Sequence, residues 1–356
     1  MAYKTVQINP VSPEPGRGTV LVIYTGGTLG MVYDVKDKQL VPFNFDQIIQ
    51  RVPEIARLDF EITFLTLAQP IDSSNMTPQI WLEIAHIISQ HYQIYDSFVI
   101  LHGTDTMAYT ASALSFLLEG LNKPVILTGA QLPIGVARSD ARENFITALE
   151  IAAATLDNGN PVISEVCIYF NSKLLRGNRS KKQESSDFNA FHSENYPHLA
   201  NAGVRIDYNF PFITPYNPET TLTVQPVMDT QVAFLKMFPG IHERVVFSIL
   251  GIEGLKGVVL ETYGAGNATT EKWFLDAVGN AIDRGIVIFN VSQCDGGRVT
   301  QGQYQTSKFL KDAGVVSGSD ITAEAAITKM MYVFGKQGKV DVPGLLGNAL
   351  RGEMSN

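Results

Sequence analysis

The chain has 356 residues, of which 45% are hydrophobic and 17% charged, and this length and composition are typical of a globular protein with two domains. The formal net charge is −8, from 35 acidic and 27 basic residues, and the longest basic run is the pair Lys181–Lys182, so we expect no nucleic-acid partner. No segment has the roughly 20 apolar residues of a membrane span. Residues 1–18 lack the features of a secretory leader, so the sequence predicts a cytoplasmic protein with no membrane partner.

The two cysteines are too few for a disulfide framework. Cys167 lies in an apolar run and is expected to be a small buried hydrophobic residue. Cys294 lies where a predicted strand gives way to a loop, and we assign it no catalytic role. The chain has no His-Glu-x-x-His segment and no cysteine–histidine cluster with ligand spacing, so the sequence predicts neither a metal nor a cofactor.

Buried strands alternate with helices in the first half of the chain. A helix is expected after Thr77, a plausible N-cap followed by Pro78, and another from about 106 to 119. Continuous β-branched and aliphatic runs without polar alternation predict strands buried on both faces, at 20–24, 98–101 and 124–127. This alternation predicts an α/β fold with a mostly parallel sheet flanked by helices.

The pattern breaks down between residues 205 and 228, where four prolines occur without a helical period. Strand and helix patterns then resume. We therefore predict three parts: an N-terminal α/β catalytic domain at 1–204, an interdomain linker at 205–228, and a smaller C-terminal α/β domain at 229–356.

Polar loops follow the predicted strands, where α/β sheets bind their ligands. Residues 25–28 read Thr-Gly-Gly-Thr, residues 102–107 read His-Gly-Thr-Asp-Thr-Met, and residues 128–131 read Thr-Gly-Ala-Gln. A fourth polar loop, residues 71–78, precedes a predicted helix. Their occurrence at one expected edge of the sheet predicts a site there.

Each loop also has a plain structural interpretation. The first is a glycine turn or a nucleotide loop, although its spacing fits neither phosphate-binding fingerprint. Thr104 or Asp105 can serve as a helix N-cap. A histidine at a strand end, such as His102, is more often a packed residue than a general base.

Together, the segments 25–28 and 102–107 resemble the two signature segments of bacterial-type asparaginases. The resemblance extends over nearly the whole chain and is strongest to the type I, cytoplasmic branch, through residues 72–74, 176–179, 263–268 and 350–353. It implies hydrolysis of the side-chain amide of L-asparagine to L-aspartate and ammonia through a threonine nucleophile, with weaker action on glutamine.

The resemblance also implies roles for single residues. Thr28 matches the threonine that attacks the amide carbon. Thr104 and Asp105 match the pair that, with a lysine, activates water or relays protons, and Asp105 also suits the α-ammonium group of the substrate. The lysine falls on Lys182, with neighbouring Lys181 as the alternative.

Binding residues are carried over in the same way. Asp72, Ser73 and Ser74 match the segment that holds the α-carboxylate and α-amino ends of the substrate. Asn267 matches a position that reaches a neighbouring subunit's site, which implies a homodimer or homotetramer. The segment around Cys294 matches one associated with allosteric activation.

One position departs from the family pattern. Members of the family usually carry a tyrosine shortly before a proline on the loop after the first motif, and Leu40 stands there in this chain. Tyr33 is one candidate for the group that deprotonates Thr28, and a different base is the other.

Two other functions compete with hydrolysis. A glutaminyl-tRNA amidotransferase-like subunit would carry an extra N-terminal domain, for which we expect no space before the first strand, and the acidic balance disfavours tRNA. A catalytically silent amino-acid sensor would not need Thr28, Thr104, Asp105 and Lys182 together.

Overall fold

The computed structural model describes residues 3–8, 18–34, 39–42, 52–303 and 305–355. The chain divides into two compact units. One comprises Met1–Ser193 and Pro197–Val224, and the other Glu194–Tyr196 and Gln225–Asn356. Both combine helices with a sheet, so the predicted α/β class is confirmed. The predicted domain boundaries stay a prediction.

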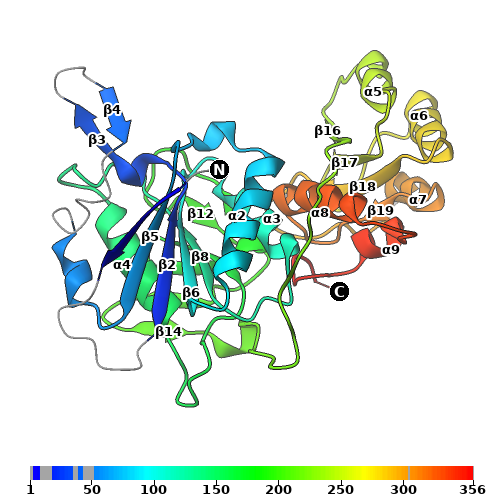
Figure 1. The fold of residues 1–356 in the computed structure, drawn as a ribbon. Coiled ribbons are helices and arrows are strands. Elements are labelled where there is room, and N and C mark those ends of the chain that lie inside the picture. The colour runs from blue at the N-terminus through cyan, green and yellow to red at the C-terminus, as the bar shows by residue number, and fades with distance from the viewer. Residues whose placement is uncertain (1–2, 9–17, 35–38, 43–51, 304, 356) are drawn as a thin grey trace. The chain divides into compact units, whose positions relative to one another are not determined.

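The first unit is built on a nine-stranded sheet, in the order β1-β5-β2-β6-β8-β9-β10-β13-β14 (Figure 1). The central strands β5, β2, β6, β8 and β9 run parallel, and the pairs outside them are antiparallel. The strands span Tyr3–Ile8 (β1), Thr19–Tyr24 (β2), Glu61–Leu67 (β5), Ser97–Leu101 (β6), Val125–Thr128 (β8), Val166–Phe170 (β9), Lys173–Arg176 (β10), Ala200–Ala202 (β13) and Ile206–Tyr208 (β14).

The parallel strands form the core of this unit. Val22 lies between Phe64 of β5 and Val99 of β6, and Val99 pairs with Ile126 of β8. All four side chains are fully buried. Each such burial stabilises the fold by roughly 1.5–3 kcal/mol. The strands predicted from continuous apolar runs are therefore confirmed.

Within the described residues, three helices cover this sheet: α2 (Pro78–His91), α3 (Met107–Leu117) and α4 (Ala141–Ala153). Figure 1 shows α4 on one side of the strands and α2 and α3 on the other. Thr77 is the N-cap of α2, as predicted, although its side chain makes no capping hydrogen bond. The predicted end of the second helix at 119 was wrong by two residues, because residues 118 and 119 form a strand.

Short elements complete the first unit. Three two-stranded pairs are β3 (Met31–Asp34) with β4 (Gln39–Pro42), β7 (Leu118–Glu119) with β15 (Thr223–Val224), and β11 (Lys181–Lys182) with β12 (Phe191–His192). The 3-10 helices of the described part of this unit are η1 (Thr28–Gly30), η3 (Pro53–Arg57), η4 (Ser73–Asn75), η5 (Gly177–Arg179) and η6 (Phe210–Phe212).

The second unit is smaller and has a four-stranded parallel sheet. Its strands, in spatial order, are β16 (Val232–Lys236), β17 (Gly257–Thr262), β18 (Val287–Ser292) and β19 (Val316–Ser317). Its helices are α5 (Glu243–Leu250), α6 (Lys272–Asp283), α7 (Gln305–Asp312), α8 (Ala323–Gly335) and α9 (Val342–Gly347). No helix within the described ranges is long and apolar enough to cross a bilayer.

A buried ion pair fastens the C-terminal segment to α8 in the second unit. Lys329 and Glu353 are both fully buried, and their Nζ and Oε1 atoms lie 2.6 Å apart. The Lys329 ammonium also donates to the backbone oxygens of Leu346 and Asn348, and the Glu353 carboxylate accepts from the backbone N–H of Leu350. Burial lowers the pKa of Lys329, and Glu353 partly offsets this effect. Each charge therefore depends on its partner.

We expect Glu353→Ala to lower the free energy of unfolding by about 3–5 kcal/mol, because it leaves the Lys329 charge buried without a counter-charge. Chemical denaturation followed by circular dichroism measures this change. The control is Asp276→Ala, which breaks the exposed pair Lys272–Asp276 and should cost less than about 1 kcal/mol. Equal effects of the two substitutions would contradict this view of the buried pair.

Candidate active site

The loops after β2 and β6 pack backbone to backbone. Gly26 and Gly27 have φ angles of 136° and 90°, which side chains rarely adopt. A Cβ added at Gly27 would lie 2.6 Å from the Cα of Gly103, and one added at Gly26 would lie 2.6 Å from the backbone nitrogen of Ile71. Only glycine permits this approach, so the sequence brings the two loops into direct contact.

The loop after β5 closes the same cluster. A Cβ added at Gly103 would lie 2.6 Å from the Oγ of Ser73, and the hydroxyl of Thr106 donates to the Ser73 backbone oxygen at 2.7 Å. Thr28 directly follows Gly27, and Thr104 directly follows Gly103. The contacts between their neighbours therefore draw the two threonines to one edge of the sheet.

Thr28 begins η1 and is half-buried. The first N–H groups of a helical turn lack a partner inside that turn. The Thr28 N–H is thus suited to hold an incoming ligand.

Thr104, Asp105 and Lys182 form one connected group. The Lys182 Nζ donates to the Thr104 Oγ1 and to the Asp105 Oδ1, each at 2.7 Å. Thr104 is 8% exposed, the Lys182 side chain 15% and the Asp105 side chain 67%. The N-cap of α3 is Thr106, so the alternative of Thr104 or Asp105 as the cap is wrong. A cation beside a buried hydroxyl lowers the energetic cost of negative charge on that oxygen.

The register of β11 distinguishes the two lysines. Lys181 pairs with His192 and Lys182 with Phe191, and successive side chains of a strand point to opposite faces. The contacts with Thr104 and Asp105 are made by Lys182.

Asp72 shapes its own turn. Its Oδ1 accepts from the backbone N–H and the hydroxyl of Ser74, at 2.9 and 2.8 Å. These bonds hold the pKa of the Asp72 carboxyl below its ordinary value. Ser73 is buried, whereas Asp72 and Ser74 are exposed. The turn thus presents an ionised carboxylate and a hydroxyl at the loop surface.

His102 is packed inside the protein, which agrees with the plain structural interpretation of this residue. Its side chain is fully buried, with Nδ1 2.6 Å from the Gly103 backbone oxygen and Nε2 2.8 Å from the Thr110 hydroxyl. The Trp81 indole donates to the same hydroxyl at 2.9 Å. Burial lowers the pKa of His102 to about 4. Both ring nitrogens are engaged, so His102 cannot take a proton from Thr28.

Gln131 contacts the site although we did not select it from the sequence. The Thr104 hydroxyl donates to its Oε1 at 3.4 Å, and its Nε2 donates to the Asp187 backbone oxygen at 2.8 Å. The signal was present in the segment 128–131, a polar loop that follows a buried strand.

Two other predicted residues are Asn267 and Tyr33. Asn267 belongs to the second unit, where its backbone forms a bridge with Tyr263. Tyr33 pairs with Leu40 across the β3–β4 hairpin, but the side chains of both lie outside the described residues. The group that deprotonates Thr28 therefore stays a prediction.

The cysteines follow their sequence patterns. Cys167 is fully buried, as predicted, and burial raises the pKa of its thiol. Cys294 is exposed.

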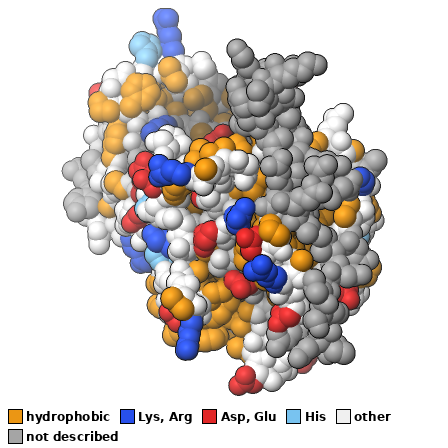
Figure 2. Space-filling model, turned by 90° about the vertical axis from the view of Figure 1, so that its left-hand side faces the viewer, with side chains coloured by type: hydrophobic (Ala, Val, Ile, Leu, Met, Phe, Trp, Pro, Cys, Tyr) orange, Lys and Arg blue, Asp and Glu red, His pale blue; other side chains and the backbone are white. Residues whose placement is uncertain are grey.

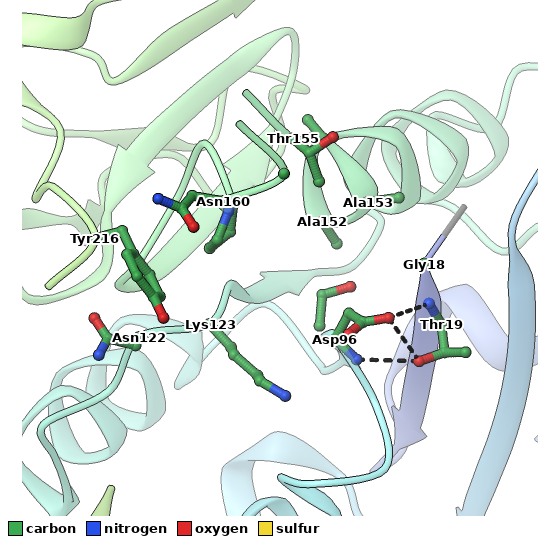
Figure 3. A pocket seen from close by; sticks show the side chains of 14 residues that line it. Gly18, Thr19, Asp96, Asn122, Lys123, Ala152, Ala153, Thr155, Asn160 and Tyr216 are labelled. Carbon is green, nitrogen blue, oxygen red and sulfur yellow. Dashed lines mark hydrogen bonds between the residues drawn. The ribbon is translucent and has the colours of Figure 1, made fainter. Parts of the chain in front are cut away.

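A separate hollow of about 300 Å³ lies where the strands of the first unit begin (Figure 3). Lys123 lines it and donates to the backbone oxygens of Tyr92 and Tyr95, at 2.6 and 2.9 Å. Asp96 accepts from the backbone N–H and the hydroxyl of Thr19, at 2.8 and 3.0 Å. The charged groups of Lys123 and Asp96 thus hold neighbouring chain segments together. They lie at the edge of the sheet opposite to Thr28 and Thr104.

Comparison with known proteins identifies the family. Residues 19–213 match the model described as asparaginase, N-terminal, and residues 231–342 match that of the glutaminase/asparaginase C-terminal domain. The chain belongs to the asparaginase family. L-asparaginase 1 of Escherichia coli K12 is 41% identical over 343 residues, which cover 95% of this chain and 98% of that protein. The predicted resemblance is confirmed.

A solved structure and a more distant relative agree with this membership. The crystal structure of L-asparaginase I from Vibrio cholerae has a TM-score of 0.86 and 37% identity, covering 96% of this chain and all of that chain. One component of the glutamyl-tRNA(Gln) amidotransferase of Pyrococcus abyssi is 31% identical, over 91% of this chain and 74% of that protein. The amidotransferase is the more distant of these relatives.

We expect stability to fall at low pH because of His102. Between pH 6.5 and about 4 the unfolded chain binds a proton that the folded protein does not, so folding stability is present above pH 6.5 and is lost as the pH falls. From pH 7 to 4.5 this loss should reach roughly 2–3 kcal/mol. Urea denaturation at the two pH values, with His102→Gln for comparison, measures it. An unchanged pH dependence in the variant would show that His102 is not its source.

Proposed function

We propose that this asparaginase-family chain hydrolyses the side-chain amide of L-asparagine to L-aspartate and ammonia, with Thr28 as the nucleophile. The observation that carries the proposal is the connected group of Lys182, Thr104 and Asp105 at the sheet edge where Thr28 lies. Action on glutamine is a weaker activity of the same site. No nucleic acid or metal enters the proposed reaction.

In the first half-reaction the Thr28 oxygen attacks the amide carbon, and the C–N bond breaks. The amide nitrogen leaves as ammonia with the proton that Thr28 gives up, and an ester joins Thr28 to the aspartyl group. Backbone N–H groups of the glycine-rich loops are suited to hold the carbonyl oxygen as it gains negative charge. One such donor contributes on the order of 3 kcal/mol to transition-state stabilisation.

In the second half-reaction water attacks the ester carbon and the bond from that carbon to the Thr28 oxygen breaks. One proton of the water restores the Thr28 hydroxyl, and aspartate leaves. Thr104 is the proposed group that activates this water. The Lys182 ammonium, 2.7 Å from the Thr104 oxygen, stabilises negative charge there. The Thr104 hydroxyl therefore gives up its proton more easily than that of an isolated threonine, and the resulting oxygen can take a proton from the attacking water.

Asp72, Ser73, Ser74 and Asp105 are the proposed binding groups for the free amino-acid ends of the substrate. The Asp105 carboxylate is largely exposed and suits the α-ammonium group. The backbone and hydroxyl of the 72–74 turn suit the α-carboxylate. Such contacts would favour a free amino acid over a peptide.

The proposed active form is a cytoplasmic homodimer or homotetramer in which Asn267 of one protomer completes the site of another. Allosteric activation through the region of Cys294 belongs to the same proposal. Sedimentation velocity that gives only the mass of a single chain in the active enzyme would contradict the oligomer.

A tRNA-dependent amidotransferase is the less favoured function. The net charge is −8, and on the face that Figure 2 shows, basic side chains lie beside acidic ones. Binding to a nucleic-acid backbone needs a clustered basic surface. An amino-acid sensor would bind asparagine without releasing ammonia, so the assay below separates it from an enzyme.

We expect Thr28→Ala and Thr104→Ala each to lower kcat for ammonia release from asparagine at least about a hundredfold, as for nucleophile and proton-relay groups. Steady-state assays with asparagine and with glutamine over a wide concentration range measure this. A near-normal kcat in either variant would remove that residue from the mechanism.

The two lysines provide a matched comparison within the same experiment. Lys182→Met should lower kcat by about a hundredfold or more, whereas Lys181→Met should change it less than about threefold. The two substitutions are chemically identical and lie in one short strand. Equal effects would refute the specific role of Lys182.

A further inference from the structure

The loop that follows β8 is held by a carboxylate outside the substrate-binding groups. Asp140 precedes α4 at its N-cap position, but its side chain does not cap that helix. Its oxygens instead accept from the backbone N–H of Gln131, at 3.1 and 3.0 Å, and of Leu132 at 3.1 Å. Bonds from an N–H to a carboxylate are stronger than those between neutral groups. Asp140 therefore fixes the backbone of Gln131.

Asn144, one helical turn further along α4, holds the Asp140 carboxylate in place. Its side chain is fully buried, and its Nδ2 donates to the Asp140 Oδ2 and to the Gly129 backbone oxygen, each at 3.1 Å. Its Oδ1 accepts from the backbone N–H of Asn171 at 3.1 Å. Each polar atom of the amide has a partner, so its orientation is set.

The Gln131 side chain connects this fixed backbone to Thr104. Its Nε2 donates to the Asp187 backbone oxygen, which can only accept, so the amide must turn its Oε1 towards Thr104. The Lys182 Nζ donates to the Thr104 oxygen, which leaves the hydroxyl proton of Thr104 for Gln131. The Thr104–Gln131 separation of 3.4 Å is near the limit of a hydrogen bond, so a small shift of the loop would break it.

We propose that Asp140, supported by Asn144, is a positioning residue that aligns the Gln131 carbonyl oxygen with the Thr104 hydroxyl. The inference rests on the proposed function, since it concerns the direction of the Thr104 proton during hydrolysis. Asp140 acts through Gln131 and does not touch the substrate. Its loss should therefore lower kcat far more than it changes KM.

The test uses the full chain and measures ammonia release from asparagine. Asp140→Asn removes the charge and turns one acceptor into a donor, and Gln131→Met removes the amide while keeping an unbranched chain. Each should lower kcat by about tenfold and change KM less than about threefold, as for a misaligned catalytic group. The double variant should be no slower than about the slower single variant, because residues that act in series are not additive.

Asp96→Asn is the matched control. Asp96 also accepts from a backbone N–H, that of Thr19 at 2.8 Å (Figure 3). This bond lies where β2 and β6 begin, at the edge of the sheet opposite to Thr104. This substitution should lower the melting temperature and leave kcat within about twofold, since it shifts no catalytic group. A comparable loss of kcat in this control would show that Asp140→Asn acts through general destabilisation and would overturn the proposal.

The remaining outcomes also decide the matter. An unchanged kcat in Asp140→Asn would overturn the positioning role. A double variant whose fold loss of kcat equals the product of the fold losses of the two single variants would overturn it as well. If Asp140→Asn does not fold, Gln131→Met alone decides, because an unchanged kcat in that variant leaves Asp140 nothing to act through. Absence of ammonia release by the unmodified protein would refute the proposed function instead, before any variant is compared.

Discussion

The close contact between Gly27 and Gly103 is the constraint on which the site depends. Parallel pairing of β2 and β6 brings the two strand ends together, but only the absence of side chains at these positions lets the backbones touch. Each glycine is followed by one of the two threonines. The geometry of the proposed chemistry is therefore a consequence of backbone packing at the carboxyl edge of the sheet.

The second determinant of the site is the charge of Lys182 beside Thr104. The Lys182 ammonium has an exposed carboxylate on one side and a buried hydroxyl on the other. Water screens the exposed part of this arrangement, so its pairing with Asp105 contributes little to stability and leaves the lysine free to act on Thr104. Lys329 and Glu353, by contrast, are fully enclosed and serve to hold the chain end. The exposed lysine–carboxylate pair thus serves the proposed chemistry, whereas the buried pair stabilises the fold.

Sequence reasoning succeeded where the determinant is local. Continuous apolar runs identified the buried strands, and the Thr-Gly-Gly-Thr and His-Gly-Thr-Asp-Thr-Met segments identified the loops. It placed the lysine on Lys182 but kept Lys181 as an alternative, because only the pairing of β11 with β12 determines which side chain faces Thr104. It also placed the end of α3 two residues late, since the pairing of β7 with the distant β15 ends that helix. Gln131 was missed because its partners lie 27 and 56 positions away in the chain.

The most direct test of this account is a crystal structure of the protein with bound L-aspartate, the product of the proposed reaction. The account predicts that the side-chain carboxylate of the ligand lies between the Thr28 and Thr104 hydroxyls, within hydrogen-bond distance of both. Aspartate bound with only one of these hydroxyls in reach, or two threonines that face different cavities, would contradict it.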